Sequence, residues 1–451
     1  MVIVKHLNEH KLLNDPDKSR PVISSAEKPR LPPGRSGWPL AGETLDFFSR
    51  ANQGCLHKFV ADRRKKFSSN IFRTSLIGFP VAILCDAEGN KFLFSNENKL
   101  FKHWLPSAFD KLFPKSNNKL NTEHSKSLRK LPAFILKGDV LREYVGEMDE
   151  VMKHHLQTDW NCQRVKVSDV ARKFIFKLEC HIFLGIENQG KIDKLLKGIE
   201  EVTDGMHSVP LDVPGSAFRR AIKASKLMRE EFEEMVRQRK IDRLDSSSGK
   251  DFISHALQAT DDNGQLFNEA DIASHLLGAL QAAYGTLHHT ITNIMMYLTD
   301  HPDVYNLVLR EQKEIARLKK SKERLSWEDL RKMKYSWNVA CEALRLKSPA
   351  LGGFKEAITD VDYGGYTIPQ GWMMHWNAHA THMNPEYFPN PEKFDPSRFQ
   401  GDGPSSYTFV PFGGGAHMCP GYEYARLAIC IFLHYPITRP AQGLPVLLYP
   451  L

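Results

Sequence analysis

The sequence predicts a mainly α-helical protein with a smaller strand-rich portion that both ends of the chain contribute. Three observations support this fold class. Helical periodicity dominates from about residue 123 to residue 347. Short β-like runs precede that region, and others follow residue 350, where proline and glycine become frequent. With 451 residues, the chain is also long enough to bury a large core.

The N-terminal part divides into a tail and a hinge. Residues 1–30 are polar and charged, so we expect a disordered tail there. They lack the run of about 20 apolar residues that a membrane span requires, and they lack the apolar region of a secretory signal. Prolines and glycines punctuate residues 31–39, which we expect to form a stiff segment. The resemblance described below implies that this segment is a Pro/Gly hinge. Residues 40–451 are expected to form one domain.

Local signals then place the first elements. Phe72–Leu76 and Val81–Cys85 are expected to form a hairpin joined by Gly78, Phe79 and Pro80. One helix is expected to open at Ser216. Asn268 is a typical N-cap residue and predicts the start of another helix, which is expected to stop before Pro302.

Further signals lie nearer the C-terminus. Ser326 and Asp329 have the spacing of a capping box at the start of a short helix. Tyr366–Ile368 and Met373–Trp376 are typical of short strands. A last helix is expected to begin just after Cys419 and to break at Pro436.

Composition excludes several function classes. Hydrophobic residues make up 41% and charged residues 25%, as in ordinary globular proteins. The net charge is +8, but lysines and arginines are dispersed, so no nucleic-acid partner is expected. This mildly basic surface suits an acidic partner protein, or it is merely solvated. The seven cysteines are scattered and odd in number, which favours reduced thiols over a disulfide framework.

A glycine-rich segment that ends in a cysteine carries the clearest chemical signal. Residues 412–421 read Phe-Gly-Gly-Gly-Ala-His-Met-Cys-Pro-Gly. Three glycines allow a tight turn and a close approach to a flat cofactor. The expected helix after Cys419 would place its N-terminus near the sulfur, which favours a thiolate. Pro420 suits the first turn of that helix.

Other interpretations of this segment are weaker. A lone cysteine is usually a small buried hydrophobic residue. A phosphate-binding loop would need a lysine and a hydroxyl residue that are absent here. A structural zinc site would need three more ligands, and Cys430 is the only thiol nearby.

The spacing F-x-x-G-x-x-x-C-x-G resembles the haem-binding loop of the cytochrome P-450 family. The resemblance covers roughly residues 31–434 and implies the family's mainly α fold. It implies haem b (iron protoporphyrin IX) as cofactor, with Cys419 as the thiolate ligand of the iron. Phe412, Gly415 and Gly421 are the other motif positions of this loop.

Glu342 and Arg345 form an E-x-x-R pattern on one helix face. Alone, such a pair is most often an exposed surface pair. Its neighbours are mostly apolar, which predicts burial, and buried charges must be paired. By resemblance, Arg398 supplies a second arginine to the same network. We interpret all three residues as structural, behind the haem.

The resemblance also extends to an oxygen-activating helix, in which Thr286 matches the threonine that assists proton delivery. Gly285 stands where that motif has an acidic residue, and glycine in mid-helix can mark a kink. Thr286 can instead bond back to its own helix carbonyls. His289, four residues after Gly285, is a hypothetical proton source, although a structural histidine is the commoner role.

Haem propionates need cationic or hydrogen-bonding partners. By resemblance these are Arg129, Lys355 and His417. Lysine and histidine stand where the family has arginine, so bidentate geometry is lost and weaker haem retention is expected. For each of the three, a surface charge without a ligand is the alternative.

Three phrases resemble the plant branch of the family that oxidises triterpenoids such as β-amyrin: residues 89–97, 333–342 and 418–426. Pocket candidates by resemblance are Phe101–Phe113, Ala282 and Pro349–Phe354, with core packing as the alternative. The resemblance also implies that the membrane anchor and part of the C-terminal region are missing.

The function implied is a haem-thiolate monooxygenase that inserts one oxygen atom from O2 into a hydrophobic small molecule of terpenoid or sterol type. Cys419 donates electron density to the iron. Electrons would come from an NADPH-dependent flavin reductase, at the cytosolic face of the endoplasmic reticulum membrane. Two alternatives stay open: a haem-thiolate isomerase or dehydratase without O2 activation, and a truncated remnant without enzymatic activity.

Overall fold

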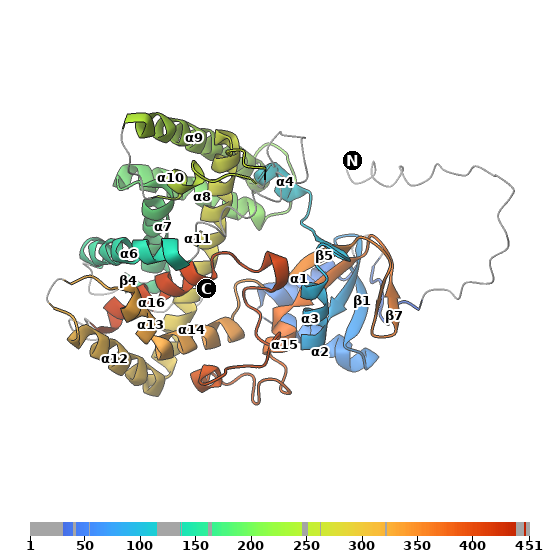
Figure 1. Ribbon diagram of the computed structural model, residues 1–451. Coiled ribbons are helices and arrows are strands. Elements are labelled where there is room, and N and C mark those ends of the chain that lie inside the picture. The colour runs from blue at the N-terminus through green and yellow to red at the C-terminus, as the bar shows by residue number, and fades with distance from the viewer. Residues whose placement is uncertain are drawn as a thin grey trace.

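A block of helices and a five-stranded sheet make up the described part of the chain (Figure 1). The computed structural model describes residues 30–38, 42–53, 55–114, 136, 138–160, 165–245, 251–261, 263–320, 323–438 and 446–447. The helical block consists of α6 (Gly138–Asp159), α7 (Val167–Glu179), the π-helical turn η1 (Cys180–Leu184), α8 (Gln189–Met206), α9 (Ala217–Asp245), α10 (Phe252–Ala256), α11 (Glu269–Asp300), α12 (Pro302–Arg317), α13 (Trp327–Lys332), α14 (Lys334–Leu346) and α16 (Tyr422–Thr438).

The sheet joins strands from both ends of the chain, in the order β1-β2-β8-β5-β3. Only β2 and β8 run parallel; the other neighbours in this sheet are antiparallel. Its strands are β1 (Ile71–Leu76), β2 (Phe79–Leu84), β3 (Phe101–His103), β5 (Gly352–Ala357) and β8 (Met373–Asn377). Two small pairs complete the described strands: β6 (Val361–Tyr363) with β7 (Tyr366–Ile368), and β4 (Val165–Lys166) with β9 (Val446–Leu447).

Short helices accompany the sheet on the right of Figure 1. They are α1 (Thr44–Asn52), α2 (Leu56–Phe67), α3 (Ala87–Ser95) and α15 (Ala378–His382). The short helix α4 (Ala108–Leu112) lies instead beside α8 and α9, where Leu112 packs against Phe218 and Ala221. The 3-10 turns are η2 (Pro396–Phe399) and η3 (Gly415–His417). The predicted fold class, mainly α with a smaller β-rich portion from both ends, is confirmed.

The first hairpin is tighter than the sequence predicts. Its turn consists of Ile77 and Gly78, with φ angles of 54° and 80°, and Leu76 pairs directly with Phe79. Positive φ at both central residues is typical of the two-residue turns that match strand twist. Phe79 and Pro80 therefore belong to β2 and not to the turn. Pro80 is tolerated because the pairing of β2 with β8 begins only at Val81.

Two of the predicted helix starts have the expected side-chain caps. The side chain of Asn268 accepts the backbone N–H of Asp271 at 2.8 Å and begins α11. Ser326 and Asp329 form the reciprocal capping box at the start of α13. These starts depend only on residues three apart, which is why the sequence predicts them well.

The last helix does not break at Pro436 as expected. α16 continues to Thr438, two residues beyond the proline. Proline removes one backbone donor and its ring crowds the preceding turn, effects that end a helix most strongly in its interior. Because Pro436 stands only two residues before the end of α16, its effect on the helix is small.

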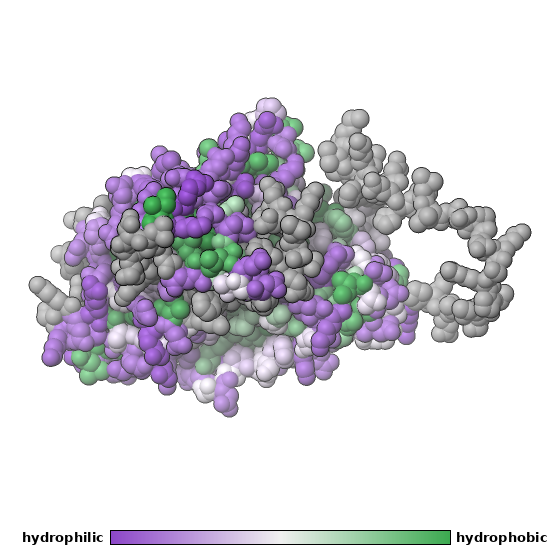
Figure 2. Space-filling model, turned by 45° about the horizontal axis from the view of Figure 1, so that its top comes forward, coloured by the Kyte–Doolittle hydropathy of each residue, from purple (hydrophilic) through white to green (hydrophobic). Residues whose placement is uncertain are grey.

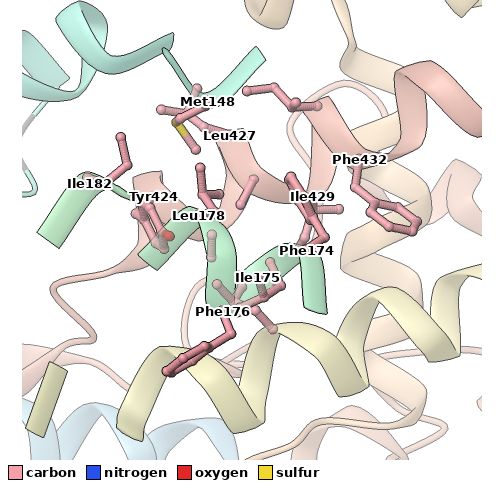
Figure 3. Close-up of a cluster of buried hydrophobic side chains, with 14 of the residues drawn as sticks. Met148, Phe174, Ile175, Phe176, Leu178, Ile182, Tyr424, Leu427, Ile429 and Phe432 are labelled. Carbon is pink, nitrogen blue, oxygen red and sulfur yellow. The ribbon is translucent and has the colours of Figure 1, made fainter. Parts of the chain in front are cut away.

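The main core lies where α7 packs between α16 and α11 (Figure 3). Phe174, Phe176 and Leu178 on α7 are fully buried, as are Leu427 and Phe432 on α16. Such apolar burial contributes about 25 cal/mol per Å² and is the main stabilising force of this layer.

One charged residue interrupts this core. Glu179, at the end of α7, is 0% exposed, and neither carboxylate oxygen has a hydrogen-bond partner in the described part of the chain. Burial therefore raises its pKa well above the ordinary glutamate value. The folded protein consequently favours the neutral carboxylic acid at this position.

The surface is largely hydrophilic on the face in Figure 2, where separate hydrophobic areas interrupt it. Between α8 and α9, Val209, Leu211 and Val213 are 71%, 59% and 51% exposed. Among the described residues, no helix is both long and apolar enough to cross a membrane.

Candidate active site

A cavity of about 640 Å³ lies between α11, the cysteine loop and the segment that precedes β5. The size is within the usual range for ligand pockets. Apolar side chains and glycines supply most of its wall, and the polar residues are few. The residues that the argument uses are Gly278, Ala282, Thr286, Pro349, Ala350, Phe412, His417, Cys419 and Gly421.

The glycines of the cysteine loop are required by its conformation. Gly413 and Gly415 have φ angles of 69° and 71°, which side chains rarely adopt. A Cβ atom at Gly414 would come within 2.5 Å of the Phe94 ring. The loop closes where the backbone N–H of Cys419 donates to the Phe412 carbonyl at 2.9 Å. The loop therefore holds Cys419 in the cavity wall with little freedom.

Cys419 lines the cavity and is exposed to it. Partial desolvation by the surrounding protein raises the pKa of its thiol, and a hydrogen bond from the Gly421 backbone N–H partly offsets this effect. The thiol form is thus favoured until a metal ion binds, because metal coordination deprotonates a thiol. α16 begins only at Tyr422, so Pro420 precedes the helix and does not occupy its first turn as expected.

Another part of the wall comes from α11, which contributes Ala282 and Thr286. The Thr286 hydroxyl donates to the Ala282 carbonyl at 2.8 Å, the back-bonded geometry considered above. α11 is continuous through Gly285. His289 is not part of the cavity wall in the described chain; its Nδ1 atom lies 2.6 Å from the Gly285 carbonyl oxygen.

Glu342 and Arg345 are brought together inside the protein, and both side chains are 0% exposed. Arg345 Nε and Nη2 each donate to one oxygen of Glu342, at 2.7 Å. Arg345 also donates to the carbonyls of His382 and Lys393, at 2.8 and 3.2 Å. Nε of Arg398 lies 3.4 Å from Glu342 Oε1. These contacts tie α14 to the segment between α15 and η2.

The predicted propionate partners are found in different places. His417 lines the cavity, whereas Lys355 lies buried on β5 and is not among the lining residues. Both contact Glu97, a buried carboxylate that the sequence analysis missed. Arg129 lies outside the described residues.

The expected pocket segments are only partly confirmed as wall residues. Phe113 lines the cavity, as do Pro349 and Ala350. Phe101 does not: it is fully buried in β3, where it pairs with Ala357 of β5. Phe354 also packs elsewhere, in a cluster below the sheet. Strand pairing across the chain, which local sequence does not reveal, removes both aromatic residues from the pocket.

The comparisons with known proteins agree with this geometry. The family model for Cytochrome P450 matches residues 32–439. The chain belongs to the cytochrome P450 family. It is 46% identical to Beta-amyrin 28-monooxygenase of Vitis vinifera, over 94% of this chain and 92% of the relative. It is 44% identical to Beta-amyrin 16-beta-monooxygenase of Platycodon grandiflorus, over 94% of each.

A solved cytochrome P450 shows the same fold. The retinoic acid bound cyanobacterial CYP120A1 superposes with a TM-score of 0.79 at 31% identity. The match covers 91% of this chain and 92% of that one. The expected family, its fold and the oxygen-inserting class of enzyme are thereby confirmed.

Membership of the cytochrome P450 family implies a haem-iron cofactor, a redox partner and a hydrophobic substrate. The described residues fit such a haem. A soft sulfur ligand faces the cavity, glycines give the backbone close access, and apolar walls suit a flat macrocycle. Lys355 and His417 bring nitrogen groups to one edge of the site. These groups can donate hydrogen bonds to the carboxylates of a ligand.

Proposed function

We propose that this protein is a haem-thiolate monooxygenase that oxidises a pentacyclic triterpene such as β-amyrin. One observation carries the proposal: a single apolar cavity brings the Cys419 loop and the Thr286 face of α11 together. The cytochrome P450 assignment supports it, as do the printed activities of the two plant relatives. Both relatives are monooxygenases, which favours oxygen insertion over the isomerase or dehydratase alternative.

Each residue has a proposed role. Cys419 holds the iron, and Phe412, Gly415 and Gly421 shape the loop around it. When bound, the haem supplies oxygen activation, which no side chain provides. Thr286 holds a proton-carrying hydroxyl on the wall of the same cavity as Cys419. The network of Glu342 with its two arginines keeps the scaffold behind the loop rigid.

The cavity suits a long hydrocarbon with a polar group at one end. Its walls near Thr286 are apolar, whereas Asp271, Ser274 and His275 line it at the start of α11. Eleven residues separate His275 from Thr286, which is about 16 Å along a helix. A triterpene hydroxyl can therefore be held at one end while an unactivated C–H bond is presented at the other. Apolar burial supplies most of the binding energy.

The proposal also specifies the type of haem, the electron donor and the membrane. Haem b would fit a site in which Cys419 offers one sulfur ligand and His417 offers a polar group. An NADPH-dependent flavin reductase is the proposed electron donor, as the redox partner that the cytochrome P450 family implies. The exposed apolar side chains between α8 and α9, including Val209 and Leu211, support contact with a membrane, proposed as the endoplasmic reticulum.

The test is expression with a flavin reductase in yeast cells that make β-amyrin. We expect a ferrous–carbon monoxide Soret band at the thiolate position and an oxidised triterpene in the extract. Mass spectrometry then distinguishes oxidation at carbon 28 from oxidation at carbon 16. Cells that express Cys419→Ala are the matched control. An imidazole-like band, or haem-loaded protein without product, would contradict the proposal.

A further inference from the structure

Glu97 is a buried carboxylate that contacts His417 of the cavity wall. It ends the phrase 89–97 that resembles the plant branch, but the sequence assigns it no role of its own. It follows α3 in the turn that leads to β3, and its side chain is 1% exposed. A carboxylate in such a position costs several kcal/mol unless it is paired. The groups that pair with Glu97 therefore indicate its role.

Three parts of the chain meet at this carboxylate. The Lys355 ammonium, on β5, contacts Glu97 Oε1, and its side chain is only 5% exposed. Nδ1 of His417 lies 2.5 Å from the same oxygen. The backbone N–H of His417 donates to Glu97 Oε2 at 3.1 Å. Glu97 thus links β5 directly to the loop that carries Cys419, two residues after His417.

The surroundings of the cluster are closely packed. A Cβ atom at Gly415 would come within 3.1 Å of Glu97 Oε2 and 2.5 Å of the Phe94 carbonyl. The ring of His103, which pairs with Lys355 across the β3–β5 ladder, stacks on His417 with a centroid distance of 5.4 Å. The carboxylate therefore has little room to turn away from its partners.

The Lys355 ammonium can donate hydrogen bonds to a second anion besides Glu97. Burial alone lowers the pKa of Lys355 to about 8. The Glu97 carboxylate is in direct contact and opposes that shift, so we take Lys355 to be charged at neutral pH. An ammonium group has three donors, and contact with Glu97 occupies only part of them. The others can serve a ligand carboxylate at the same edge.

We propose that Glu97 is a positioning residue for the carboxylate edge of the haem. It holds the Lys355 ammonium and the His417 imidazole in one cluster and fixes the cysteine loop through the His417 backbone. This inference rests on the proposed function. It adds a residue that acts through its neighbours and does not itself touch the iron.

The test uses the haem-loaded protein and the variant Glu97→Gln, which keeps the side-chain shape but removes the charge. The control is Glu356→Gln. Glu356 is the next residue after Lys355 on β5, and it pairs with Lys102 at 2.8 Å. Haem release is followed as transfer to excess apomyoglobin, well below the unfolding temperature. The ferrous–carbon monoxide spectrum is recorded in parallel.

We expect Glu97→Gln to release haem about 10–100-fold faster, the usual effect of losing a residue that orients a ligand group. A larger share of its Soret band should lie at the imidazole-like position. Glu97→Asp should restore part of the retention, and Glu356→Gln should match the unsubstituted protein. In the double variant Glu97→Gln/Lys355→Met the two effects should not add, because the residues act as a unit.

Two results would overturn the inference. In the first, Glu97→Gln retains haem and its spectrum as the unsubstituted protein does. In the second, it lowers the unfolding temperature without changing the haem-transfer rate, which would make Glu97 structural only. If the unsubstituted protein bound no haem, the proposed function itself would fail, and this outcome is distinct from both.

Discussion

Loss of the Arg345 side chain should be among the most destabilising single changes in the chain. The variant Arg345→Met keeps most of the side-chain volume but removes the charge. It leaves Glu342 buried with one weaker partner, Arg398, 3.4 Å away, and the Asp395 backbone N–H. It also leaves the His382 and Lys393 carbonyls without their donor.

The magnitude follows from these contacts. Breaking a buried ion pair by removing one partner costs about 3–5 kcal/mol, because an uncompensated charge remains. Hydrogen bonds that involve a charged group contribute about 1.5–3 kcal/mol each, and Arg345 makes four of them. Retained partners and relaxation offset part of this sum. We therefore expect a loss of about 4 kcal/mol, out of the roughly 5–15 kcal/mol typical of folded domains.

The assay is urea unfolding followed by circular dichroism, with Arg398→Met as the matched control. Arg398 is 11% exposed, and its guanidinium also bonds to the carbonyls of Pro389 and Asn390. Its removal leaves the bidentate Glu342–Arg345 pair intact, so its loss should cost about 1–2 kcal/mol. The reasoning fails if Arg345→Met costs less than 1 kcal/mol, or less than Arg398→Met.

Three further predictions concern the cavity and the core. Cys419→Ser should abolish the thiolate-type Soret band in the ferrous–carbon monoxide spectrum, and an unchanged spectrum would exclude Cys419 as the ligand. Thr286→Ala should lower product formation about tenfold or more with haem content unchanged, whereas His289→Ala should not; equal product yields would remove the role of Thr286. Glu179→Leu should stabilise the protein by about 1–3 kcal/mol at neutral pH, because it removes a buried carboxyl that has no hydrogen-bond partner among the described residues. The raised folded-state pKa means that unsubstituted protein loses stability as pH rises above about 4.3, the unfolded value. Glu179→Leu should flatten that slope in unfolding experiments between pH 5 and 8, and an unchanged slope would show that Glu179 is not its source.

The sequence predicts those features that depend on neighbouring residues. The caps at Asn268 and Ser326 need only residues three apart, and the structure has both. The cysteine loop is recognisable because its glycines and Cys419 lie within ten residues. Family resemblance adds Arg398, which lies far from Glu342 along the chain and close to it in space.

The features that the sequence does not predict depend on distant contacts. Glu97 lies between two asparagines in what reads as an exposed turn, yet its partner His417 is 320 residues away. Phe101 looks like a pocket residue until β5, some 250 residues later, pairs with it. Glu179 follows an apolar helix pattern, but no local rule shows that the described layers around it offer its carboxylate no hydrogen bond. An alignment that showed Glu97 and Lys355 changing together would have revealed the first of these.

The central pairing of the sheet has a consequence for biosynthesis. β2 ends at Leu84, but its parallel neighbour β8 begins only at Met373. At 5–20 residues per second, a ribosome takes on the order of 15–60 s to make the chain between them. During that interval the nascent N-terminal hairpin has an open edge of the kind that invites aggregation. Yield in a heterologous host should therefore respond to slower translation at low temperature and to co-expressed chaperones that shield exposed strands.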